Sequence, residues 1–365
     1  MAGDLTQLDR SLLERLQQDV PLVSRPYAAL AAELAWPEAA LIARVEELSG
    51  PVGIIREIAG IFDAAGLGYR SVLAAMTLPV RKLNQAGEIV SDHPGVSHCY
   101  ARQCRRRKPP APNLWFTLAL PPESRLGLEG TLQRLKQLTG AKAWYSFPTV
   151  RRFKLDARVS FTDRTAQERV AGVSPSLLAA IPPLGGLPEA RAGCPRHVDL
   201  ANEVTRRAIA ALQTPLPAVA QPFAVIAPPA GLSEPELLSQ GRELLAAGLM
   251  RRYAAVLRHQ AAGATQNVLL AWQVPQERIE TFGQFAAASP AVSHCYQRQT
   301  SPDWPFNFYT MLHAASPRQM RGAVAALAGF GKFPHLVLRT VREYKKRKIR
   351  FFSPEFERWE KQNAG

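Results

Sequence analysis

The spacing of hydrophobic positions changes from a helical to a strand-like period within each half of the chain. Residues 8–50 hold three short runs with apolar positions three or four residues apart, and Pro37 stands where the third run begins. Three short helices followed by the segment GIIREI predict a winged helix-turn-helix.

After residue 70 the apolar residues gather in four short runs that are typical of strands: SVLAAMTLP, VSHCYARQ, NLWFTLAL and AKAWYSFPTV. Helical spacing fits 81–92, between the first and second runs, and 122–139, between the third and fourth. The resulting order, βαββαβ, predicts a ferredoxin-like domain.

The whole pattern occurs twice in the chain. LQQDVPLVSRPYAAL (16–30) aligns with LQTPLPAVAQPFAVI (212–226), and SHCY occurs at 97 and again at 293. TVRRFKLDARVSF (149–161) aligns with TVREYKKRKIRFF (340–352). Because these blocks keep their order at nearly constant spacing, the chain is an internal duplication.

The duplication and the element order together predict the fold class. We expect an α+β protein of two tandem repeats, each a winged helix-turn-helix followed by a ferredoxin-like domain, with the sheets packed as an internal pseudo-dimer. A segment between the repeats (173–196) is rich in Pro, Gly and Ala and is typical of a linker. The predicted boundaries are 1–50 and 51–165 for the first repeat, 166–195 for the linker, and 196–247 and 248–360 for the second repeat.

Composition narrows the class of protein. A hydrophobic content of 47% with 21% charged residues indicates a globular chain. No apolar run approaches the roughly 20 residues that span a bilayer. The N-terminus lacks the apolar core of a signal peptide, so we expect a cytoplasmic protein. The four cysteines form no CxxC pair, which argues against a zinc or iron–sulfur site built from cysteines.

The net charge of +15 indicates an acidic partner, either nucleic acid or a small polyanion. A winged helix joined to a ferredoxin-like domain is the layout of Lrp/AsnC transcription regulators. However, the candidate recognition helix at 37–50 holds one arginine against three glutamates, and its counterpart at 233–248 is equally poor in basic residues. Phosphate would repel such helices, so binding to DNA is not expected.

Polar residues alternate along the repeated SHCY strand. His98, Tyr100 and Arg102 share one strand face by the two-residue period, and so do their counterparts in the second copy, His294, Tyr296 and Arg298. Ordinary core packing is an alternative for the tyrosines. Three polar side chains in a row do not fit a dry core unless they are paired, so we predict a functional site on this face.

Basic residues keep equivalent places after the last strand of each repeat. Arg151 and Lys154 in the first copy align with Arg342 and Lys345 in the second. Such runs are often solvated charged faces, but repeated basic positions near His and Tyr favour a pocket for a ligand rich in carboxylates.

Several of these motifs together resemble a known family. GIIREIAGIFDAAGLGYRSVLAAM, HPGVSHCYAR followed by NLWFTLAL, and the closing RRFKL are similar to the sirohaem decarboxylases, which are Lrp/AsnC-derived proteins. The resemblance covers both halves apart from the linker, and it is to the fused form with two related subunits in one chain.

The resemblance implies a substrate and a reaction. Sirohaem, an iron isobacteriochlorin with eight carboxylates, would lose two acetate carboxyl groups as CO2 to give 12,18-didecarboxysirohaem for d1-type haem or an alternative haem route. No organic cofactor is implied, because the iron arrives with the substrate. Candidate partners are other haem d1 biosynthesis proteins and a second copy of the chain, and the sequence leaves the oligomeric state open; no membrane association is expected.

The candidate residues follow from the repeated strand and this resemblance. His98 and His294 are the predicted catalytic residues; the open roles are general acid, carboxylate donor and axial ligand to the substrate iron. No metal bound by the protein alone is expected. His313 aligns with Ala119, which suggests that the two copies are not equivalent. The predicted substrate-binding residues are Tyr100, Arg102, Arg151, Lys154, Tyr296, Arg298, His313, Arg342, Lys345, Arg56, Arg251, Trp115 and Tyr309.

Some of these residues have alternative roles. Arg56 and Arg251 would either reach the site from the wing or cap the helical domain. Trp115 and Tyr309 would either line a flat binding pocket or pack in the core. The alternative function is an Lrp/AsnC-like regulator that senses a tetrapyrrole or another anion, and a third is a haem-binding chaperone without turnover.

Overall fold

The computed structural model describes residues 5–50, 53–104, 111–155, 198–258, 266–301 and 303–363. These residues form two compact units. The helical unit comprises the described residues up to Leu67 and those between 198 and 258, and the barrel unit comprises the described residues from Gly68 to 155 and from 266 onward. The predicted linker (166–195) lies entirely outside the described residues.

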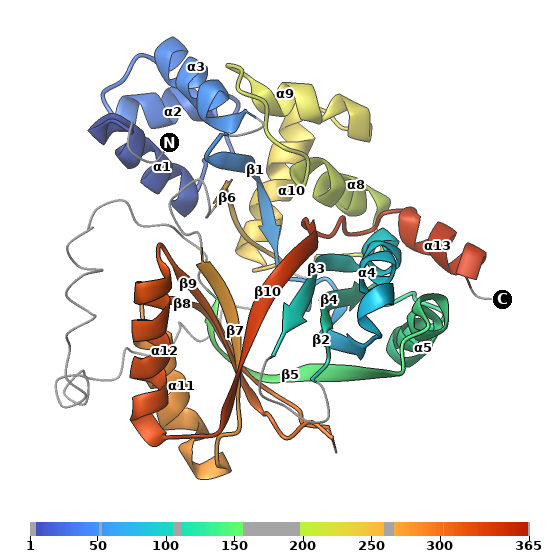
Figure 1. Cartoon of the computed structure of the whole chain (residues 1–365). Helices are drawn as coiled ribbons and strands as arrows, with labels where there is room; N and C mark the ends of the chain where they lie inside the picture. Colours follow the sequence, from blue (N-terminus) through green and yellow to red (C-terminus); the bar gives the residue numbers. More distant parts are fainter. Residues whose placement is uncertain are drawn as a thin grey trace. The chain divides into compact units, whose positions relative to one another are not determined.

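The helical unit contains two copies of a three-helix arrangement, each followed by a strand (Figure 1). The first copy is α1 (Gln7–Gln18), α2 (Pro26–Glu33), α3 (Glu38–Ser49) and β1 (Ile55–Phe62). The second copy is α8 (Glu203–Leu212), α9 (Pro222–Ile226), η3 (Pro228–Ala230), α10 (Glu234–Ala246) and β6 (Met250–Leu257). Strands β1 and β6 pair with each other in an antiparallel ladder.

Local sequence signals explain where these helices begin. Thr6 accepts a hydrogen bond from the amide of Asp9 while Asp9 bonds back to Thr6, and Ser233 and Glu236 form the same capping box at α10. Proline occupies the first turn of α2 and of α9. The predicted winged helix-turn-helix is confirmed in both repeats.

The barrel unit contains eight strands in the order β10-β3-β4-β2-β5-β8-β9-β7, and β7 pairs back with β10. Its strands are β2 (Arg70–Thr77), β3 (Val96–Gln103), β4 (Leu114–Leu120), β5 (Ala143–Leu155), β7 (Gln266–Trp272), β8 (Val292–Arg298), β9 (Phe308–Ala314) and β10 (His335–Lys346). Its helices are η1 (Val80–Lys82), α4 (Leu83–Asp92), α5 (Gly127–Thr139), η4 (Gln276–Arg278), α11 (Ile279–Ala288), α12 (Pro317–Gly331) and α13 (Glu355–Asn363).

Each repeat has the predicted βαββαβ order, and the fold class is confirmed. The repeats are joined more closely than two stacked sheets, because β5 and β10 are long enough to serve both. The first half of β5 pairs with β2 of its own repeat, and its second half pairs with β8 of the other repeat. Strand β10 does the same with β7 and β3. The sheet therefore closes, which leaves no exposed edge.

Two hydrophobic clusters lie outside the barrel and one lies inside it. Outer residues of β2, β3 and β4 pack against α4 and α5, and outer residues of β7, β8 and β9 pack against α11 and α12 (Figure 1). The inner cluster contains Trp115, Phe147, Trp304 and Tyr309. Alternate residues of each strand point into and out of the barrel, and this alternation decides which side chains can form a site inside it.

The domain boundaries expected after residues 50 and 247 differ from the observed division. Strands β1 and β6 follow those boundaries, yet they pair with each other in the helical unit. The physical reason is that β1 and β6 complete each other's hydrogen bonding, so neither is needed by the ferredoxin-like sheets.

Candidate functional site

The first copy of the repeated strand places His98, Tyr100 and Arg102 on the inner face of the barrel. In the ladder with β4, His98 lies opposite Thr117 and Tyr100 lies opposite Trp115, which belongs to the inner cluster. Residues opposite each other in a ladder point to the same face. Cys99 points the other way, into the outer cluster. We call His98, Tyr100 and Arg102 the first row.

Neutral groups hold the side chain of Arg102, the last residue of the first row. Its Nη1 donates to the carbonyl oxygen of Leu338 at 3.3 Å and to Oγ1 of Thr340 at 3.0 Å. The guanidinium carbon lies 4.9 Å from the ring centre of Tyr100. Desolvation by burial lowers the pKa of Arg102 to about 10.

The second copy repeats this arrangement with His294, Tyr296 and Arg298, which we call the second row. Nη1 of Arg298 donates to the carbonyl oxygen of Phe147 at 2.9 Å and to Oγ1 of Thr149 at 3.0 Å. Its guanidinium carbon lies 4.7 Å from the ring centre of Tyr296. Burial again lowers the arginine pKa. The contacts that hold each arginine thus come from the last strand of the other repeat.

A serine fixes each histidine ring from the preceding position. Oγ of Ser97 lies 2.9 Å from Nδ1 of His98, and Oγ of Ser293 lies 2.7 Å from Nδ1 of His294. Each histidine ring lies just over 6 Å from the tyrosine of its row, at 6.2 Å and 6.4 Å between ring centres. Oriented imidazoles beside tyrosines and arginines can exchange protons with a bound carboxylated ligand.

Trp115 and Tyr309 belong to the inner cluster and lie opposite Tyr100 and Tyr296 respectively. The indole of Trp304 donates to the hydroxyl of Tyr309 at 2.8 Å, and that hydroxyl donates to the carbonyl oxygen of Phe306 at 3.2 Å. Trp115 stacks on Phe147 with 5.6 Å between ring centres. Both predicted residues are therefore core aromatics whose flat faces line the interior.

The four basic residues of the closing strands lie on the outer face instead. Arg151 pairs with Glu280 on α11, and Lys154 Nζ donates to the carbonyl oxygen of Ser289 at 2.9 Å. In the second repeat, Arg342 lies 4.0 Å from Glu88 on α4, and Lys345 Nζ donates to the carbonyl oxygen of Ser91 at 2.6 Å. The structure therefore separates these four residues from both rows.

Three inner-face residues were missed by the sequence interpretation. Arg152 lies opposite Tyr296, Glu343 lies opposite Tyr100, and Lys346 lies opposite His98. Irregular register at 149–154 and at 340–345 shifts the alternation, so the residues next to those predicted face inward. Only the alignment of RRFK with REYK could have drawn attention to the Arg152 and Glu343 pair.

The other predicted residues fall in two places. His313 lies on β9 opposite Asn267, two residues along the strand from Met311, which faces His294. Arg56 and Arg251 lie on β1 and β6 of the helical unit. Nη2 of Arg251 donates to the carbonyl oxygen of Phe62 at 3.2 Å. A role for these two arginines in binding stays a prediction.

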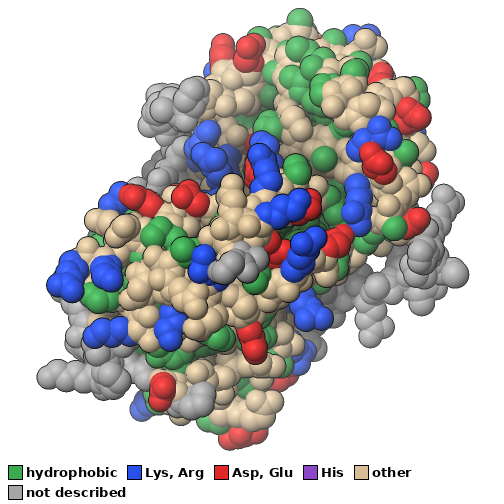
Figure 2. Space-filling model, turned by 90° about the vertical axis from the view of Figure 1, so that its right-hand side faces the viewer, with side chains coloured by type: hydrophobic (Ala, Val, Ile, Leu, Met, Phe, Trp, Pro, Cys, Tyr) green, Lys and Arg blue, Asp and Glu red, His purple; other side chains and the backbone are tan. Residues whose placement is uncertain are grey.

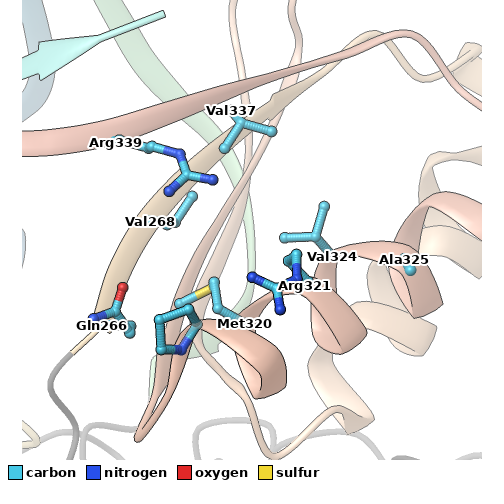
Figure 3. A pocket seen from close by; sticks show the side chains of 9 residues that line it. Gln266, Val268, Met320, Arg321, Val324, Ala325, Val337 and Arg339 are labelled. Carbon is cyan, nitrogen blue, oxygen red and sulfur yellow. The ribbon is translucent and has the colours of Figure 1, made fainter.

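Two hollows of the barrel unit lie away from the rows. One, of about 210 Å³, lies between α12 and the strands β7 and β10, with Arg321 and Arg339 on its walls (Figure 3). Its residue Val268 belongs to the outer cluster, so this hollow faces away from the barrel interior. It is also smaller than the roughly 300 Å³ at which sites for organic ligands begin.

The charged groups of the described residues mark no second candidate on the face shown in Figure 2. On the face seen in Figure 2, Lys and Arg side chains are spread among Asp and Glu. No group of His, Cys, Asp and Glu that could hold a metal ion occurs among the described residues. Within the same residues, no helix is long and apolar enough to cross a membrane.

Family models match both parts of each repeat. Residues 9–56 and 205–251 match a model described as a siroheme decarboxylase NirDL-like HTH domain. Residues 66–154 and 261–345 match a model described as an AsnC-like ligand binding domain. The fold and the inner rows thus define a tandem protein of helix-turn-helix and AsnC-like ligand-binding domains.

Full-length relatives narrow this class. The chain is 33% identical to a siroheme decarboxylase of Hydrogenobacter thermophilus, over 96% of this chain and 97% of the relative. It is 31% identical to a siroheme decarboxylase NirDL subunit of Paracoccus pantotrophus, over 94% and 97%. This chain belongs to the siroheme decarboxylase family.

Two solved structures have the same fold over the whole chain. The crystal structure of the siroheme decarboxylase NirDL matches with a TM-score of 0.72 and 30% identity, over 98% of both chains. The same enzyme in co-complex with an iron-uroporphyrin III analogue matches with a TM-score of 0.72 and 29% identity, over 98% of this chain and 99% of that one.

Proposed function

We propose that this protein is a carboxy-lyase that removes two acetate carboxyl groups from sirohaem as CO2, giving 12,18-didecarboxysirohaem for d1-type haem or an alternative haem route. The observation that carries this proposal is the duplicated row of His, Tyr and Arg on the inner face of the barrel. Full-length relatives named as siroheme decarboxylases support the same activity, and so does the solved structure of a siroheme decarboxylase NirDL in co-complex with an iron-uroporphyrin III analogue.

The rows supply what the reaction needs. Cleaving the bond between the methylene carbon and the carboxylate releases CO2 and leaves the electron pair on that carbon, next to the pyrrole. A proton must then reach the carbon to make the methyl group. An oriented imidazole is suited to deliver this proton, and arginine forks bind the carboxylates that fix the ring. The buried aromatic wall around Trp115 and Tyr309 keeps water from the shifting charge.

The remaining parts of the proposal concern cofactors and partners. The reaction needs no organic cofactor, because the iron belongs to the substrate. Other haem d1 biosynthesis proteins would pass the tetrapyrrole on, a homodimer is the proposed assembly, and the enzyme would act in the cytoplasm.

A DNA-binding role has less support. Arg44 is the single arginine of α3, and it donates to Asp9 at 2.7 Å and to Glu47 at 2.6 Å. Arg242 of α10 donates to the carbonyl oxygen of Leu22. Basic side chains held in this way are not available for phosphates, so the helix-turn-helix serves as scaffold.

Anaerobic incubation of the purified protein with sirohaem tests the activity. Product mass should fall by two CO2 units, with a change in the visible spectrum. A spectral shift without mass loss would mean binding alone, and no change would exclude the tetrapyrrole as ligand.

A further inference from the structure

The two rows match at three positions but differ at the inner-face residues that the neighbouring strand places opposite them. Opposite the tyrosine, β5 places Arg152 in the second row, whereas β10 places Glu343 in the first. Arg152 and Glu343 are equivalent in the duplication. Duplication therefore produced one row with an added cation and one with an added anion at the same ladder position.

The two rows also differ in how far solvent reaches them. Tyr100 and Arg102 of the first row are 7% and 3% exposed, whereas Tyr296 and Arg298 of the second row are half-buried. Arg152 itself is exposed. At the tyrosine and arginine positions, the second row therefore presents more accessible surface to an anionic ligand than the first row does.

The charged residues opposite the two rows also differ, and they favour an anionic ligand at the second row. A carboxylate arriving at Tyr296 meets Arg152 and Arg298, and the described residues opposite this row in the β5–β8 and β8–β9 ladders include no acidic one. A carboxylate arriving at Tyr100 meets Glu343, and β10 places Lys346 opposite the neighbouring His98. Like charges at short range oppose binding, and a guanidinium fork favours it.

We propose that the second row alone binds the carboxylates of the tetrapyrrole, and that Arg152, contributed by the first repeat, is a binding residue of that site. The first row is then a structural counterpart that holds β3 and β10 together. This inference rests on the proposed function. It makes the site composite, because its histidine and tyrosine come from one repeat and its additional arginine from the other.

Equilibrium titration with sirohaem under anaerobic conditions, followed by absorbance, tests the inference on the full chain. We expect one sirohaem bound per chain. Arg152→Gln should raise the Kd by about 10-fold to 100-fold, since it removes a charge-assisted hydrogen bond. Arg152→Lys keeps the charge without the fork and should fall between the wild type and Arg152→Gln.

Glu343→Gln is the matched control, because it neutralises the equivalent position of the other row. It should leave the Kd within about twofold, since the first row makes no ligand contact. Thermal unfolding of both variants shows whether they fold, and since both residues are exposed we expect both to do so.

Each outcome separates this inference from the proposed function. Two sirohaems per chain, or equal losses in Arg152→Gln and Glu343→Gln, would overturn the assignment to one row while decarboxylation still stands. Weaker binding in Glu343→Gln alone would assign the site to the first row. If the wild type does not bind sirohaem, the proposed function itself fails.

Discussion

The two repeats of the barrel have the same strand register, but the side chains packed around the paired strands differ between them. On the outer face of the first repeat, His93 is buried against Trp359 and Phe356 of α13, whereas the second repeat has Ser289 at this place. On the inner face, Tyr100 and Arg102 of the first row are buried, whereas Tyr296 and Arg298 of the second row are half-buried. Duplication has therefore preserved the ladders, which fix the fold, and has let the contacts around them diverge into a structural half and a ligand-binding half.

Removing the histidines tests this comparison most severely. His294→Ala should lower the decarboxylation rate by about 100-fold or more, because a positioned general acid contributes on the order of 10²–10⁴ in rate. His98→Ala should lower it by less than about 10-fold, since His98 belongs to the first row, which the proposal gives no contact with the ligand. Single-turnover product mass under anaerobic conditions measures both. Equal losses would show that both halves take part in the chemistry.

The arginines should separate stability from binding. Arg102→Met leaves the carbonyl oxygen of Leu338 and Oγ1 of Thr340 without this donor in the core, which should cost about 1–3 kcal/mol of unfolding free energy. Arg298→Met should cost less, because Arg298 is half-buried whereas Arg102 is buried, but it should weaken sirohaem binding. Urea unfolding gives the first quantity. If the urea midpoint of Arg102→Met equals or exceeds that of the wild type, burial of the guanidinium destabilises the fold by more than its hydrogen bonds stabilise it.

His93 should make the stability of the first repeat depend on pH. Burial, with a smaller contribution from the charge of Lys345, lowers its pKa from 6.5 to about 3. Below pH 6.5 the unfolded chain takes up a proton that the folded chain refuses, so stability falls as the pH drops toward 3. Between pH 7 and pH 5 this amounts to about 2 kcal/mol.

A matched variant isolates this contribution. His93→Gln can still accept the hydrogen bond that the amide of Gly95 donates to Nδ1 at 2.9 Å. Its unfolding free energy should fall less between pH 7 and pH 5, by about 2 kcal/mol, than that of the wild type. An equal fall in unfolding free energy between pH 7 and pH 5 for the wild type and His93→Gln, measured by urea titration at each pH, would show that folding does not lower the pKa of His93.

Much of the fold follows from local patterns in the sequence. Period-two alternation placed His98, Tyr100 and Arg102 on one face, and the structure confirms it because β3 is regular over these residues. Helix positions followed equally from apolar spacing and from proline at helix starts. These features depend on a few neighbouring residues, which a single sequence displays.

Features that depend on distant pairing could not be predicted in the same way. If β5 had no irregular register, Arg151 would share a face with Phe147 and Thr149, as alternation requires. The shift between Thr149 and Arg151 turns Arg152 inward instead, and β5 bends from one repeat into the other at the same place. Nothing in the residues 149–154 marks this shift, since it is set by the partner strand.

This shift leads to the smallest expected effect. Arg151 and Glu280 form an ion pair on the outer face, with side chains 55% and 44% exposed. Exposed pairs of this kind contribute about 0–1 kcal/mol, so Arg151→Gln should change stability by less than that. Sirohaem affinity should stay within about twofold, in contrast to the loss expected for its neighbour Arg152. A larger loss of affinity in Arg151→Gln than in Arg152→Gln would show that the strand is regular in solution and that the originally predicted basic residues face the ligand.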